Sequence, residues 1–165
     1  MIVAGFDPGL AALGQARIER SGSRYVCSLA ETVRTKPSSS DDARMLEIWQ
    51  SLTSGDVLAF EEQHGVFSGK AREGRADGNS AKVREVVGLL RARAYHLGAD
   101  LVVIPPSRVR SSLGLPPGAG KAQVRAVVER LVSGLPRTIS QHAVDAVAVA
   151  IAGERAARAI RRGAA

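Results

Sequence analysis

The sequence predicts one α/β domain, spanning residues 1–165, with helices on both faces of a mixed sheet of about five strands, the first three antiparallel. Three apolar or alternating runs come first, separated by short polar turns, and such turns favour antiparallel neighbours. Helical and strand patterns then alternate, as they do where helices connect parallel strands. No internal repeat or long linker divides the chain, whose length suits a single core.

The expected strands are short apolar runs bounded by turn residues. The first, IVAGF, ends in the turn Asp7-Pro8-Gly9, and the polar segment RSGS forms a hairpin between the second and third. A fourth run ends in two carboxylates, and a fifth, DLVVI, is stopped by two prolines. These strands are expected at residues 2–6, 13–19, 24–34, 56–61 and 100–104.

The expected helices are marked by residues that begin or end them. Ser40 is a suitable N-cap for the first helix and Gly55 follows its end, while Gly98 closes the second. Ser107 is expected to cap a short third helix that ends near Gly114. The longer helices are expected over about 41–53, 80–97, 121–133 and 141–161.

The composition indicates a folded protein, and its charge distribution fits either a polyanionic partner or ordinary solvation of helix surfaces by arginine. Hydrophobic residues make up 45% and charged residues 24%, and the net charge is +7. Residues 1–62 carry 6 Lys/Arg and 9 Asp/Glu, whereas residues 63–165 carry 17 and 7, so the basic charge lies in the second part. No apolar run approaches the roughly 20 residues of a membrane helix, and Cys27 is the only cysteine. We therefore expect a cytoplasmic protein without a membrane partner, and nucleic acid is a candidate ligand.

Acidic residues stand at the ends of two expected strands, where functional groups of such sheets gather. Asp7 follows the first strand, and Glu61 and Glu62 follow the fourth. His142 and Asp145 are three residues apart, so they share one face near the start of the last helix. Carboxylates that lie close together repel each other unless a cation is present, and oxygen ligands suit Mg²⁺ or Mn²⁺. Two such ions about 3.5–4 Å apart are a common device for hydrolysing phosphodiesters.

These motifs resemble the Holliday-junction resolvases of the RuvC type, within the ribonuclease H-like nucleases. The matching segments occur in the family's order and cover nearly the whole chain: GFDPGLAALG at 5–14, AFEEQ at 59–63, RVRSSLGL and GKAQV within 108–124, and HAVDAVAVAIA at 142–152. The resemblance implies a ribonuclease H-like fold and a structure-selective endonuclease. Such an enzyme resolves four-way DNA junctions by paired, symmetric incisions in homologous recombination and DNA repair.

The resemblance implies that Asp7, Glu61, His142 and Asp145 are both the catalytic and the metal-binding residues. Strand alternation alone does not decide whether Glu61 or Glu62 is the site residue, since the two face opposite sides of the strand. The family's pattern favours Glu61. Histidine stands at 142 where a carboxylate is also found in the family. A nitrogen ligand should favour Mn²⁺ over Mg²⁺, and two ions per active site are expected.

Basic and aromatic residues are expected to bind DNA. Arg110 and Lys121 fall where the family has lysines near the scissile phosphate. In the loop 63–79, either His64 or Phe67 could stack on an unpaired base at the junction centre, and we favour Phe67. The remaining DNA-binding candidates are Lys70, Arg72, Arg75 and Lys82.

A symmetric junction cut on two strands requires two active sites, so the resemblance implies a C2 homodimer. The apolar face of the helix 80–97 is a candidate interface, although part of it must cover the sheet: Val83, Val86, Val87, Leu90 and Ala94. A branch-migration helicase complex is a possible partner in this family. Two alternatives remain open from the sequence: another ribonuclease H-like nuclease with a different nucleic-acid substrate, and a non-catalytic junction-binding module.

Overall fold

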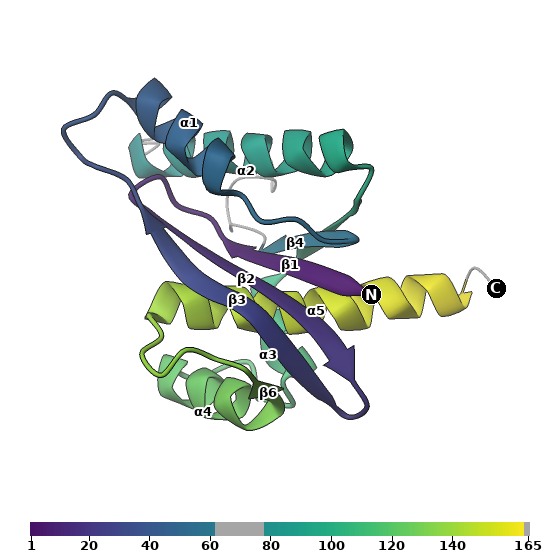
Figure 1. The fold of residues 1–165 in the computed structure, drawn as a ribbon. Helices are drawn as coiled ribbons and strands as arrows, with labels where there is room; N and C mark the ends of the chain where they lie inside the picture. The colour runs from purple at the N-terminus through teal and green to yellow at the C-terminus, as the bar shows by residue number, and fades with distance from the viewer. Residues whose placement is uncertain (62–77, 164–165) are drawn as a thin grey trace, which may run out of the picture.

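A computed structural model, which describes residues 1–61 and 78–163, shows a mixed sheet of six strands in the order β5-β4-β1-β2-β3-β6 (Figure 1). β1, β2 and β3 are antiparallel, whereas β4 and β5 run parallel to β1 and β6 runs parallel to β3. The predicted antiparallel start of the sheet is confirmed. The strands are β1 (Ile2–Asp7), β2 (Ala12–Ser21), β3 (Arg24–Arg34), β4 (Val57–Glu61), β5 (Asp100–Ile104) and β6 (Val132–Ser133).

Helices cover both faces of the sheet, as predicted. α1 and α2 lie on one face and α3, α4 and α5 on the other, with α5 running along the strands of β1, β2 and β4 (Figure 1). Their bounds are α1 (Asp41–Ser51), α2 (Gly78–Leu97), α3 (Pro106–Ser112), α4 (Lys121–Leu131) and α5 (Gln141–Gly163).

Several helices begin or end at other residues than predicted, and two of these differences have a clear physical cause. The helix expected over 121–133 ends at Leu131, because the next two residues pair with β3 as the short strand β6, which the sequence did not indicate. Ser107 is not an N-cap: Pro105 holds the cap position and the helix begins at Pro106, since the fixed φ of proline suits a first helical turn. Ser40 does cap α1, where its side chain accepts a hydrogen bond from the backbone N–H of Ala43.

Small residues allow α5 to lie very close to the sheet. Its buried residues are mostly alanine and valine, and glycines stand on both sides of the contact. A side chain on Gly5 would overlap the backbone of Ala146, and one on Gly153 would lie 2.5 Å from the Cβ of Ala59. The strand and helix backbones therefore approach more closely than larger residues would permit, and this approach fixes where the first turns of α5 stand.

The apolar face of α2 belongs to the protomer's own core, which corrects the predicted dimer interface. Val86 and Leu90 are fully buried, with Phe6, Leu58 and Phe60 in the same cluster. This face was predicted as an interface because its apolar residues recur at helical spacing, and the same residues instead pack against the sheet.

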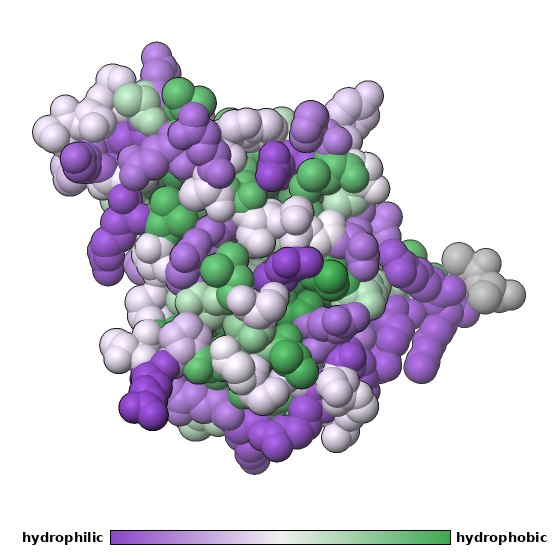
Figure 2. Space-filling model, viewed as in Figure 1, coloured by the Kyte–Doolittle hydropathy of each residue, from purple (hydrophilic) through white to green (hydrophobic). Residues whose placement is uncertain are grey.

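The view in Figure 2 shows apolar residues gathered over the middle of one face, with hydrophilic residues above them and towards the C-terminal end of α5. Val26 of β3, 46% exposed, is one of the large apolar side chains that remain accessible in the described part of the chain. Within that part, no helix is both long and apolar enough to cross a bilayer.

Candidate active site

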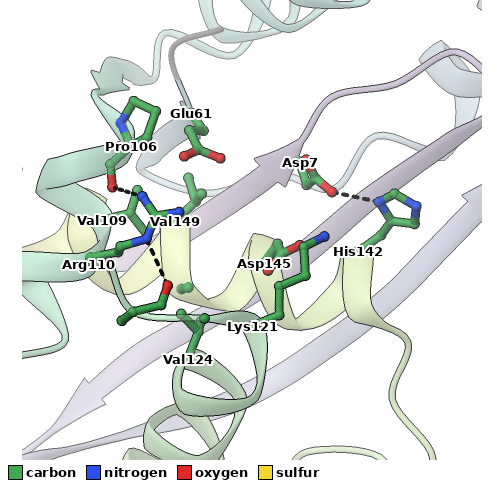
Figure 3. Close-up of a pocket in the computed structure, with 13 residues that line it drawn as sticks. Asp7, Glu61, Pro106, Val109, Arg110, Lys121, Val124, His142, Asp145 and Val149 are labelled. Atoms are coloured by element: carbon green, nitrogen blue, oxygen red, sulfur yellow. Dashed lines mark hydrogen bonds and ion pairs between the residues drawn. The ribbon is translucent and has the colours of Figure 1, made fainter. Parts of the chain in front are cut away.

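The ends of two neighbouring parallel strands bring two carboxylates to one pocket. β1 and β4 are in register from Val3 opposite Val57 to Phe6 opposite Phe60, so the next residues, Asp7 and Glu61, end their strands at the same edge of the sheet. Both line a pocket of about 360 Å³ (Figure 3). The other residues that line it come from α3, α4, α5 and the segment before α4: Pro106, Val109, Arg110, Ala119, Gly120, Lys121, Val124, His142, Asp145, Ala148 and Val149.

The N-terminal turns of α5 bring His142 and Asp145 into this pocket. Gly14 is the partner of Asp7 in the β1–β2 ladder, and a side chain there would overlap the carbonyl group of His142. The absence of that side chain lets α5 begin directly over Asp7. At the start of the helix, Ser140 caps the backbone N–H of Ala143 and shares a hydrogen bond with the hydroxyl of Thr32 on β3. The pocket thus unites all four predicted catalytic residues.

Asp7 is the electrostatic centre of the site. Its Oδ2 lies 2.7 Å from Nδ1 of His142, and its side chain is 19% exposed. Burial raises the pKa of Asp7 most, and the nearby charge of Asp145 raises it further; the hydrogen bond to His142 and the charge of Lys121 oppose both effects. A carboxylate held in this way is stabilised in its ionised form by any cation that enters the pocket.

The donor set suits a hard divalent cation. The pocket offers carboxylates of Asp7, Glu61 and Asp145 and one imidazole, the groups that bind Mg²⁺ and Mn²⁺. Among residues 1–61 and 78–163, no three His, Cys, Asp or Glu side chains are close enough to form a complete ligand cluster. Instead, His142 and Asp7 are bonded to each other. The residues therefore fit the metal in chemistry and location, and their side chains must rearrange to bind it.

Two basic residues complete the wall of the pocket. Nζ of Lys121, the first residue of α4, lies 3.6 Å from Oδ2 of Asp145, and its side chain is 74% exposed. Arg110 donates from Nε to the carbonyl of Ala119 at 3.2 Å and from Nη1 to that of Pro106 at 3.4 Å (Figure 3). These bonds hold the Arg110 guanidinium at the pocket wall, whereas Lys121 extends into solvent.

Among the described residues, one further predicted DNA contact, Lys82, is not brought to this pocket. Lys82 lies on α2, where its Nζ forms an ion pair of 2.9 Å with Asp41, and it does not line the pocket. The remaining candidates, which include both aromatic alternatives and the second acidic residue after β4, lie outside the described residues: Glu62, His64, Phe67, Lys70, Arg72 and Arg75.

Residues that the sequence analysis did not single out also shape the site. Gln141 donates from Nε2 to Oδ1 of Asp145 at 2.8 Å, and Arg125 contacts both Gln141 and the segment before α5. The spacing of Gln141 and Asp145, four residues on one helix, was the available signal. Gly14 had no comparable signal, because its role depends on a helix 128 residues further along the chain.

A mixed sheet that starts with three antiparallel strands, with acidic residues at the ends of β1 and β4 and on a C-terminal helix, defines the class of ribonuclease H-like nucleases. A family model described as "Crossover junction endodeoxyribonuclease RuvC" matches residues 3–153. The chain belongs to this family, whose members are nucleases that depend on divalent metal ions.

The chain is similar to individual relatives over nearly its whole length. The crossover junction endodeoxyribonuclease RuvC of Parvibaculum lavamentivorans is 32% identical over 171 residues, covering 96% of this chain and 93% of its own. Among solved structures, the RuvC of Thermus thermophilus is 25% identical with a TM-score of 0.75, and each chain is covered to 96%. A second Thermus thermophilus RuvC structure, in complex with a Holliday junction substrate, has a TM-score of 0.81 at 23% identity, again with 96% of each chain covered. The predicted family and fold are confirmed.

Proposed function

We propose that this protein is a crossover junction endonuclease that resolves four-way (Holliday) DNA junctions by paired symmetric incisions, in homologous recombination and DNA repair. The observation that carries the proposal is the pocket that unites Asp7, Glu61, His142 and Asp145 in a chain of this family. The junction bound in the related Thermus thermophilus structure supports the substrate.

We propose that Asp7, Glu61, His142 and Asp145 hold two Mg²⁺ or Mn²⁺ ions in each active site. When bound, such ions activate water and stabilise the leaving 3′ oxygen in phosphodiester hydrolysis. The chain itself supplies the surroundings. Burial keeps bulk water away from Asp7, and the imidazole of His142 holds its carboxylate in a defined orientation until a cation takes over.

The basic groups are proposed to hold the scissile strand. Lys121 is exposed, and its ammonium group lies at the acidic cluster, so it can bind a phosphate or stabilise charge that develops there. Arg110 is anchored by its bonds to backbone carbonyls, and we propose that it binds the same phosphate. Its guanidinium is held in a more fixed position than the ammonium group of Lys121. Lys82 and the loop residues Phe67, Lys70, Arg72 and Arg75 remain proposed contacts to the junction arms and centre.

Paired incisions require two copies of the pocket, so a C2 homodimer is part of the proposal. Each protomer provides one such constellation among its described residues. A cytoplasmic location and cooperation with a branch-migration helicase complex follow from the family's role in recombination and are proposed on that ground alone.

The test offers purified protein a synthetic four-way junction and a linear duplex of the same sequence, with Mg²⁺ or Mn²⁺. We expect symmetric nicks on two opposing strands of the junction and none in the duplex. Glu61→Gln should abolish cutting while junction binding persists. Glu47→Gln is a matched control, because Glu47 is exposed on α1 outside the pocket, and it should cut normally.

Other outcomes would replace the proposal with its alternatives. Equal cutting of junction and duplex would indicate another ribonuclease H-like nuclease with a different substrate. Junction binding without cutting under either metal would indicate a non-catalytic binding module.

A further inference from the structure

The two carboxylate oxygens of Asp145 have different partners. Oδ1 accepts a hydrogen bond of 2.8 Å from Nε2 of Gln141, one helical turn earlier on α5, and Oδ2 lies 3.6 Å from Nζ of Lys121 on α4. The terminal torsion of an aspartate is broad and nearly two-fold, so without such a bond the carboxylate group can rotate. The bond from Gln141 fixes one oxygen and thereby leaves the other directed at Lys121.

Arg125 ties this arrangement to α4. It stands one turn after Lys121, and both Nη1 and Nη2 donate to the carbonyl of Ile139, at 3.3 and 3.2 Å, directly before the N-cap of α5. Nη2 also reaches Oε1 of Gln141 at 3.5 Å. Since Gln141 accepts from Arg125 with its oxygen and donates to Asp145 with its nitrogen, its amide orientation is defined. A chain of contacts therefore runs from α4 through Arg125 and Gln141 to the active-site carboxylate.

We propose that Gln141 is a positioning residue for Asp145, and that Arg125 acts through Gln141 and Ile139 to keep α4, with Lys121, in place beside it. The inference rests on the proposed function, because it assigns Asp145 to the cation site. Outer partners of metal-binding carboxylates commonly affect metal affinity or activity by about 10- to 100-fold. Gln141 does not itself line the pocket, and its hydrogen bond to Asp145 is its contact with the residues that do.

The test is Gln141→Met, which keeps the length of the side chain but removes its hydrogen-bonding groups. Gln50→Met is the matched control, because Gln50 is exposed on α1 away from the site. We would measure Mn²⁺ binding by calorimetry without DNA, and single-turnover junction cutting at saturating metal. Gln141→Met should weaken Mn²⁺ binding and slow cutting by about tenfold each, with junction affinity in metal-free buffer and the melting temperature close to those of the control.

A second variant keeps the inference testable if Gln141→Met proves unstable. Arg125→Met leaves the Gln141 amide in place but frees it to rotate, and it should weaken Mn²⁺ binding less than Gln141→Met does. The double variant should bind Mn²⁺ as strongly as Gln141→Met alone, because both substitutions act along one chain of contacts. Unchanged Mn²⁺ affinity in Gln141→Met and Arg125→Met would overturn the inference.

The outcomes separate this inference from the proposed function. Normal junction cutting by the unaltered protein, together with normal cutting and Mn²⁺ affinity in Gln141→Met, would overturn only the role of Gln141. If the unaltered protein cut no junction, the proposed function would fail, and the Mn²⁺ measurement would still decide whether Gln141 positions Asp145. Failure of the unaltered protein to bind Mn²⁺ would overturn both.

Discussion

Gly14→Ala tests whether the close approach of α5 to β2 sets the geometry of the active site. A Cβ on residue 14 would lie 2.6 Å from the carbonyl carbon of His142 and 3.2 Å from the Cβ of Asp7. Ordinary contact begins at 3.4 Å, so the first turn of α5 must retreat from the strand by at least about 0.8 Å. Gly14 lies inside β2 with no positive φ, so the substitution adds no backbone strain and acts through its contacts with His142 and Asp7.

The displacement has two separate consequences. Forcing an extra carbon into a packed contact costs about 1–3 kcal/mol in the free energy of unfolding. Moving His142 and Asp145 away from Asp7 by nearly 1 Å should also slow catalysis by about 100-fold, the effect expected of such a misplacement. The 2.7 Å bond between His142 and Asp7 would lengthen or break for the same reason.

The assay combines urea denaturation with single-turnover cutting of a four-way junction at a temperature where the variant is fully folded. Gly88→Ala is the matched control: Gly88 is exposed in the middle of α2 with no atom near an added Cβ, so it should gain up to about 1 kcal/mol in stability and cut normally. Cutting by folded Gly14→Ala within threefold of the unaltered rate would refute the argument that this contact sets the site geometry.

Three further predictions concern charge in the site and in α5. Asp7→Asn should raise the melting temperature of the metal-free protein at neutral pH. Folding raises the pKa of Asp7, so the contribution of this residue to stability falls as pH rises through the ordinary value of 3.8 and beyond. The gain in melting temperature should therefore vanish well below that pH. His142→Asp should increase the cutting rate with Mg²⁺ relative to that with Mn²⁺, because a nitrogen ligand is replaced by oxygen. Tyr25→Phe should cost about 1–2 kcal/mol in unfolding free energy, because it removes the 3.2 Å bond from the phenol to the buried carboxylate of Glu154.

Each of these has a measurement that decides it. For Asp7→Asn, thermal melts in EDTA from pH 3 to 8 should diverge as pH rises, and a constant offset would show that the carboxylate's charge is not the cause. For His142→Asp, an unchanged ratio of the Mg²⁺ and Mn²⁺ rates would mean that residue 142 does not bind the ion. For Tyr25→Phe, urea denaturation gives the cost; cutting should remain normal, since Glu154 lies nine residues, or roughly 13 Å, beyond Asp145 on α5.

Local signals in the sequence predicted most of the sheet and the helices and indicated Asp7, His142 and Asp145 as site candidates, whereas the resemblance to the family was needed to choose Glu61 over Glu62. Apolar runs ended by Asp7-Pro8-Gly9 or by Glu61 indicate strand ends, and the register of β1 and β4 brings such ends together. β6 was missed because two residues, Val132 and Ser133, carry no periodicity of their own and form a strand only by pairing with β3.

The contacts around the site could not be predicted in the same way. Arg125 looked like one more basic residue on an amphipathic helix, and its bonds to Ile139 depend on how α4 packs beside α5. The apolar stripe on α2 was equally ambiguous: its spacing fits a dimer interface or a core, and burial of Leu90 within the protomer shows that it is core. Tertiary packing decides such cases, and no single segment encodes it.

α5 is held in place by interactions that do not involve the site itself. Near its start, Arg125 binds the preceding segment and Ser140 bonds to Thr32. Further along, Glu154, 2% exposed, accepts from Tyr25 and lies 3.6 Å from a guanidinium nitrogen of Arg20 on β2.

These anchors explain how the site can hold a destabilised charge. The repulsion between Asp7 and Asp145 would tend to push α5 away from the sheet; His142 and Lys121 offset it in part, and a bound cation would offset it further. Because the helix is fastened on either side of the cluster, its packing opposes this repulsion in the metal-free protein, in which His142 is bonded to Asp7. The packing of α5 thus opposes the repulsion between the acidic groups, and a bound cation would reduce that repulsion.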